Sequence, residues 1–177
     1  MTSPAILGAC TLALLASAAA LAGPERIAWP EGYAERFVLY NMVDRPDRGT
    51  VRFMYVDRAS HDAARPGEPL PYGTVLIMED HKARIEGDRP ARDSDGRLVP
   101  AEEVTNVFLM QKEQGWGEAY PPELRNGDWD YAWFLPDGSR KADAKFEGCF
   151  SCHLNREGER DFTFTFAKYV LDGKPRH

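Results

Sequence analysis

The most constraining feature of the sequence is a pair of cysteines near the C-terminus, followed directly by a histidine. Cys149, Cys152 and His153 form a C-x-x-C-H run. Two thiols at this spacing can add to the two vinyl groups of haem, and the adjacent histidine is then carried beneath the iron as an axial ligand. The run predicts one covalently bound haem c, attached through both cysteines, with His153 as the ligand of the metal.

Two other interpretations of the cysteine pair stay open as minor alternatives. A thioredoxin-like dithiol normally lies at a strand-to-helix junction of a βαβ unit near the start of a domain. Here the pair lies near the end of the chain, and no βαβ pattern precedes it. A zinc site would need a second pair of ligands, and His61, His81 and His177 lack metal-pair spacing.

The N-terminal segment has the pattern of an export signal. Residues 1–22 contain no charged residue and end in the small-x-small pattern Ala20-Leu21-Ala22. We expect a signal peptide cut after Ala22, a single haem domain over residues 23–177, and a periplasmic location. The apolar run is shorter than the ~20 residues of a membrane span. A lipoprotein attached at Cys10 is the less favoured alternative, because most of the apolar run follows that cysteine.

The charge of the chain restricts its partners. The formal net charge is −6, and removal of residues 1–22 leaves it unchanged. An acidic protein is a poor partner for nucleic acid or for an anionic membrane surface. We therefore expect neither as a partner. The predicted c-type haem points instead to a small-molecule ligand and a soluble redox partner.

Four short segments have strand character. Each is rich in β-branched and aromatic residues, and turn residues such as Asp95-Gly96 and Pro136-Asp137-Gly138 separate them. This punctuation predicts a mainly β fold: an antiparallel sheet with a few short helices and a c-type haem attached near the C-terminus. The predicted strands are residues 50–56, 74–79, 104–110 and 129–134.

Helices are expected at two places outside these strands. Over residues 32–42, Tyr33, Phe37 and Tyr40 recur at helical spacing, and residues 166–171 form a second candidate. The charged segment 84–97 contains glycine and proline, so we expect a solvated hairpin or loop there.

A set of ordered segments makes the chain similar to a known family. They occur in one order along nearly all of the mature chain and include Gly115-Trp116-Gly117 and Asn126-Gly127-Asp128-Trp129. Together they resemble the cytochrome P-460 family, which includes the β-sheet cytochromes c′. The segments are residues 43–47, 51–56, 73–83, 115–117, 126–129, 148–153 and 161–164.

The resemblance implies a homodimeric periplasmic cytochrome with a five-coordinate haem. One branch of the family carries a lysine cross-linked to the porphyrin and oxidises hydroxylamine. The other lacks the cross-link, covers the haem with phenylalanines and binds nitric oxide. By resemblance, Lys82 would be the cross-linking, catalytic lysine, and Phe53 and Phe108 would be the covering phenylalanines.

Other residues compete for the open side of the iron. His81 cannot face the haem together with Lys82 unless a bulge intervenes, because neighbours on a strand point to opposite faces. Met54, Met78 and Met110 could offer a thioether, although core packing is the commoner use of methionine in strands.

Three functions follow, in order of preference, with the first two close. The first is hydroxylamine oxidation at a Lys82-modified haem, the second gas binding, and the third electron transfer by a six-coordinate haem. Oxidation needs a proton acceptor near the bound nitrogen species. The strand at 104–110 offers no acid, and whether Glu102, Glu103 or Glu113 reaches the haem stays open, as does a cationic role for Arg52 or Arg58. Whether the chain is an enzyme is therefore left undecided.

Overall fold

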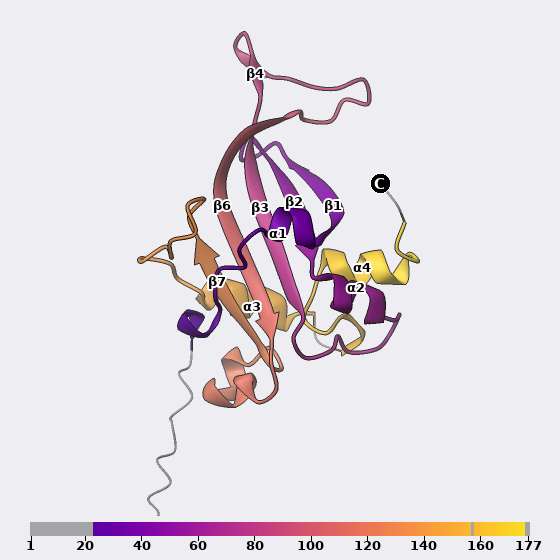
Figure 1. The fold of residues 1–177 in the computed structure, drawn as a ribbon, viewed down its shortest axis with the longest axis vertical. Helices are drawn as coiled ribbons and strands as arrows, with labels where there is room; N and C mark the ends of the chain where they lie inside the picture. Colours follow the sequence, from indigo (N-terminus) through magenta and orange to yellow (C-terminus); the bar gives the residue numbers. More distant parts are fainter. Residues whose placement is uncertain (1–22, 157, 176–177) are drawn as a thin grey trace, which may run out of the picture.

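The fold is built on one antiparallel sheet. A computed structural model describes residues 23–156 and 158–175, so the expected signal peptide lies outside the described residues. Five strands pair in the order β1-β2-β3-β6-β7, which is also their order along the chain (Figure 1). The mainly β, antiparallel prediction is confirmed. The strands are β1 Val38–Arg45, β2 Thr50–Val56, β3 Val75–Ala83, β6 Pro100–Lys112 and β7 Trp129–Phe134.

All four predicted strands are present. Residues 50–56 and 129–134 coincide with β2 and β7, whereas β3 and β6 extend beyond the predicted segments. The charged segment 84–97 projects beyond the sheet and contains a small hairpin of β4 (Ile85–Glu86) and β5 (Arg89–Pro90), as expected (Figure 1).

The helix expected over residues 32–42 is wrong for most of its length. Only α1, Tyr33–Arg36, is helical, and the chain then enters β1. The aromatic spacing misleads because Tyr33 and Tyr40 belong to opposite sides of the sheet. Tyr33 packs edge-on against Tyr55, while Tyr40 packs against Phe166. Pairing of β1 with β2 overrides the local periodicity.

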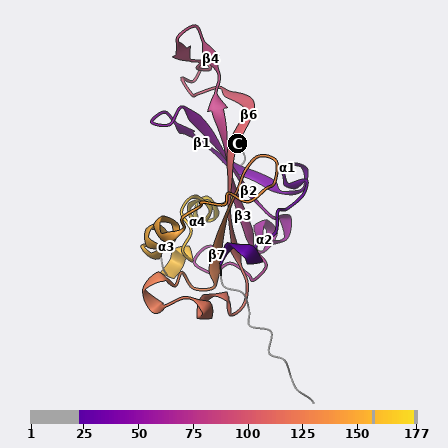
Figure 2. The same cartoon turned by 90° about the vertical axis from the view of Figure 1, so that its left-hand side faces the viewer.

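The remaining helices are short. The predicted C-terminal helix is α4, Thr165–Leu171, and the cysteine motif lies on α3, Glu147–Leu154. Figure 2 shows α3 and α4 on one side of the sheet and α1 on the other. No helix in the described part of the chain is long and apolar enough to cross a membrane. The other helical elements are α2 Arg58–Ala63 and the 3-10 turns η1 Pro24–Arg26, η2 Trp116–Ala119, η3 Pro122–Leu124 and η4 Gly158–Arg160.

Strand alternation gives the sheet two apolar faces. On one face, Met54, Leu76 and Met110 pack with residues of α3 and α4. On the other, Tyr55 and Ile77 pack with residues that precede β1. The site described below lies on the first face.

Candidate haem site

A cavity of about 370 Å³ lies between the sheet and the two C-terminal helices. Its sheet side is a row of direct cross-strand neighbours: Met54 pairs with Met78, Met78 with Phe108, and Phe108 with Trp133. Such rows place side chains of adjacent strands in contact on one face. The remaining lining residues are Tyr40, Arg45, Arg52, Leu76, Leu109, Met110, Tyr131, Ala132, Phe146, Cys149, Cys152, His153, Thr163, Phe164, Thr165 and Phe166.

The cysteine motif enters this cavity from α3. Cys149, Cys152 and His153 have i, i+3 and i+4 spacing, so they share one face of the helix, and all three line the cavity. Both cysteines are free thiols, Cys149 half-buried and Cys152 exposed. Burial, and then the neighbouring Cys152, raise the pKa of the Cys149 thiol. Catalytic dithiols instead have a thiol of lowered pKa, so the raised pKa of Cys149 disfavours the dithiol alternative.

One ring nitrogen of His153 forms a hydrogen bond to the backbone, and the other takes no part in that bond. Its Nδ1 donates a hydrogen bond of 2.6 Å to the carbonyl oxygen of Phe162, which leaves Nε2 for a metal. Burial lowers the pKa of the ring and outweighs the opposite effect of that carbonyl. A neutral imidazole is the form that binds iron. The ring also lies 5.1 Å from Tyr131 and 4.9 Å from Phe164, measured between centroids.

The charged side chain of Arg52 borders the cavity. Arg52 pairs with Asp80 across the strands, two residues along from the pair of Met54 and Met78. Arg52 forms a two-pronged ion pair with Asp80, with N–O distances of 2.6 and 2.7 Å. Its guanidinium lies 5.4 Å from the ring centroid of Phe108, and its Nη1 lies 3.6 Å from the sulfur of Met78. Both charged side chains are largely buried, at 12% and 5% exposure. Fixed in this way, Asp80 is directed to Arg52, and it is absent from the described cavity wall.

These residues fit a c-type haem. Two thiols and an imidazole share one helix face, the surrounding wall is largely apolar, and the histidine tautomer leaves Nε2 for the iron. Within the described ranges no group of three or more histidine, cysteine and acidic residues could hold a metal ion on its own. The donor set therefore suits a prosthetic group that brings its own iron.

Comparison with known proteins agrees with this fit. The family model described as Cytochrome P460 matches residues 30–165, which is most of the chain. The chain belongs to the cytochrome P460 family. Members of this family are c-type haem cytochromes, so the chain is a haem cytochrome. A search of curated proteins finds no match.

Lys82, the cytochrome P460 lysine by resemblance, lies away from the cavity. Its Nζ is 2.6 Å from Oε1 of Glu103, and the two side chains are 55% and 60% exposed. Lys82 is four residues beyond Met78 on β3, about 13 Å along the strand at ~3.3 Å per residue. The structure does not bring it together with Cys149, Cys152 and His153.

His81 and Phe53 lie on the opposite face of the sheet from the cavity. Their rings stack at 4.3 Å, and His81 also binds the buried carboxylate of Glu79, which accepts a second hydrogen bond from Tyr33. The bond to Glu79 raises the pKa of His81. Burial alone would raise the pKa of Glu79, but its hydrogen-bond donors lower it overall. His81 is thus a packed histidine, and of the two candidate phenylalanines only Phe108 lines the cavity.

The sequence-based prediction did not place several of the wall residues at the haem site. Tyr40 was assigned to a helix, and Phe164 and Thr165 lie just beyond the haem motif in sequence. Strand alternation in β1 could have identified Tyr40, because it is the buried residue of that strand. Phe164 belongs to the segment 161–164 that carries the family resemblance, but that resemblance did not assign it to the cavity. Its position and that of Thr165 depend on how the chain returns to the sheet after α3.

Proposed function

We propose that the chain binds a small neutral diatomic gas, such as nitric oxide, at an unmodified five-coordinate haem c. Cys149 and Cys152 would hold the haem and His153 would ligate its iron, and the haem would supply the binding site for the gas. One observation carries the proposal: the described wall of the cavity contains no aspartate, no glutamate and no lysine.

This wall suits a ligand that exchanges no protons. Oxidation of hydroxylamine requires a nearby group that accepts protons, whereas a neutral diatomic requires none. The carboxylate of Asp80, which lies beside the wall residue Arg52, is already neutralised by that arginine. Glu103 is paired with Lys82 at the surface, and Glu113 accepts a bond from Gln111, so neither supplies a base to the wall.

The wall also supports an open coordination position. The sulfur of Met54 accepts a hydrogen bond of 3.0 Å from Thr165, and the sulfur of Met78 lies beside Arg52. A thioether engaged by a donor is a poorer iron ligand than a free one. These contacts favour gas binding over six-coordinate electron transfer.

The deciding experiment compares the haem-loaded wild type with Lys82→Ala. Intact mass, the ferrous visible spectrum and titration with nitric oxide are measured on both. Lys168→Ala, which removes another exposed ion-paired lysine, is the control. We expect three equal spectra of ordinary c type, equal gas binding and no turnover of hydroxylamine.

The opposite outcome would support hydroxylamine oxidation. A strongly red-shifted ferrous Soret band that only Lys82→Ala loses would mean that Lys82 is bonded to the porphyrin. A separate control tests attachment: the double variant Cys149→Ala/Cys152→Ala should lose covalent haem.

We further propose that the protein acts in the periplasm as a homodimer with a soluble redox partner. Support comes from the N-terminal pattern of residues 1–22 and from the family. N-terminal sequencing of the exported protein should begin at Gly23, and light scattering should give twice the mass of the mature chain. A retained leader or a monomeric mass would contradict these two points.

A further inference from the structure

The hydrogen bond that orients His153 depends on an unusual stretch of backbone. Its acceptor is the carbonyl of Phe162, and both Asp161 and Phe162 have left-handed conformations, with φ of 42° and 58°. Residues with side chains rarely adopt this region, because Cβ then crowds the backbone. Two consecutive residues persist there only where neighbouring groups hold them.

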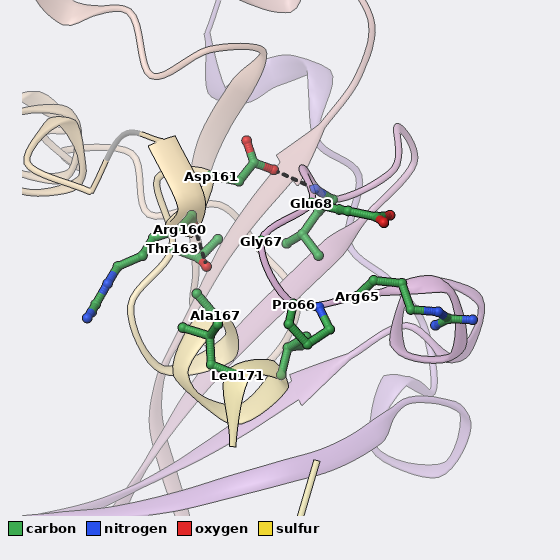
Figure 3. A pocket seen from close by; sticks show the side chains of 11 residues that line it. Arg65, Pro66, Gly67, Glu68, Arg160, Asp161, Thr163, Ala167 and Leu171 are labelled. Atoms are coloured by element: carbon green, nitrogen blue, oxygen red, sulfur yellow. Dashed lines mark hydrogen bonds between the residues drawn. The ribbon is translucent and has the colours of Figure 1, made fainter. Parts of the chain in front are cut away.

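A buried ion pair holds the first of these residues. Lys112 Nζ donates to Oδ2 of Asp161 at 2.9 Å, and the two side chains are 9% and 12% exposed. The backbone N–H of Leu70 donates to the same oxygen at 2.9 Å, and Lys112 also donates to the carbonyl oxygen of Leu70 at 2.8 Å. In Figure 3, Asp161 faces the loop that contains Gly67 and Glu68. One lysine at the end of β6 therefore ties this loop to the segment after α3.

The second residue is held by packing. The Phe162 ring is buried beneath Gly127, where an added Cβ would lie 2.9 Å from the ring. The Phe162 N–H donates to the carbonyl oxygen of Arg156 at 2.7 Å. The Phe162 carbonyl is left with a fixed direction, toward His153.

We propose that Lys112 is a positioning residue for the axial ligand, acting through Asp161 and the Phe162 carbonyl. The proposal rests on the ligation of iron by His153 proposed above. A carbonyl held on Nδ1–H raises the basicity of the imidazole and fixes its orientation. Loss of the ion pair frees the strained backbone to relax, so the carbonyl moves from Nδ1 and the iron–histidine bond weakens.

The test uses the haem-loaded ferrous protein without added gas. Lys112→Met removes the cation, Lys112→Arg keeps it, and Lys168→Met is the control that breaks an exposed ion pair on α4. Resonance Raman gives the iron–histidine stretching frequency, and redox titration gives the reduction potential. We expect Lys112→Met to lower the frequency and to make the potential more positive. Lys112→Arg should lie nearer to the wild type, and Lys168→Met should leave both unchanged.

A purely structural role would give a different result. If Lys112→Met lowered thermal stability but left the frequency and potential unchanged, the proposal would be overturned. Should Lys112→Met not fold, Asp161→Asn retains an acceptor for Leu70 and a residue that tolerates positive φ while removing the charge. It should shift both quantities in the same direction, and unchanged values would again refute the proposal. Absence of any iron–histidine band in the wild type would instead refute the proposed five-coordinate haem, so this outcome is distinct from a failure of the role of Lys112.

Discussion

The ion pair between Arg52 and Asp80 at the cavity edge permits a worked stability prediction. Arg52→Met keeps an unbranched apolar stem of similar length but leaves the Asp80 carboxylate, 5% exposed, without its cation. Removal of one partner from a buried, hydrogen-bonded pair costs about 3–5 kcal/mol, because a charge is left uncompensated. We expect a loss of this size in the free energy of unfolding, measured by urea denaturation of the haem-loaded protein with circular dichroism.

Two further variants separate burial from simple loss of a charge. Arg84→Met breaks an exposed pair with Glu86, whose side chains are 54% and 66% exposed, and should cost less than about 1 kcal/mol. The double variant Arg52→Met/Asp80→Leu removes both buried charges and should recover most of the loss. If Arg52→Met cost no more than Arg84→Met, or if the double variant were less stable than the single one, the reasoning would be refuted.

Three other predictions concern close packing at glycine, access to the haem cavity and titration of the Glu79–His81 pair. Gly117→Ala should cost more than about 3 kcal/mol or prevent folding, because its Cβ would lie 1.9 Å from a backbone oxygen. The control Gly148→Ala, whose Cβ would meet no atom within 4 Å, should be neutral or stabilising in thermal denaturation. Phe108→Ala should speed binding of carbon monoxide in stopped-flow measurements and cost about 3 kcal/mol or less; unchanged association would mean that the ring does not restrict access. Glu79→Gln should cost about 1–3 kcal/mol, and more at pH 6 than at pH 9. The contribution of Glu79, whose pKa is lowered from 4.5, is present above that value and lost as pH falls. The contribution of His81, whose pKa is raised from 6.5, is full below that value and lost as pH rises through the higher folded value. A cost that is constant between pH 6 and pH 9 would contradict this assignment.

Local patterns were sufficient to predict most of the sheet. β2 and β7 coincide with runs of β-branched and aromatic residues, and the turn at Pro136-Asp137-Gly138 closes as expected, with Gly138 N donating to the Leu135 carbonyl at 3.0 Å. The cysteine motif also needs only one helix face to bring its three residues together. Both features depend on contacts within a few residues, which a sequence displays directly.

Features that depend on distant contacts were harder to predict. The helix expected over residues 32–42 was wrong because β1 is stabilised by β2 and by aromatic packing with α4. Lys82 does lie on a strand that borders the cavity, β3, but its position near the end of that strand keeps it from the cavity wall. The cysteines of α3 face a different part of the strand, because the residues of β3 that line the cavity with them are Leu76 and Met78.

The segments that carry the family resemblance explain where α3 meets the sheet. Asn126 is buried and donates from Nδ2 to the carbonyl oxygen of Phe150 in α3, at 3.2 Å, while its Oδ1 accepts from the Tyr131 hydroxyl at 2.9 Å. The next residue, Gly127, has a φ of +55° and makes room for the Phe162 ring. One short segment therefore fixes the helix that carries the cysteines and the residue whose carbonyl orients His153. Because both depend on Asn126-Gly127, a change there should disturb haem attachment and the iron–histidine bond together, whereas a change at Lys112 should alter the bond alone.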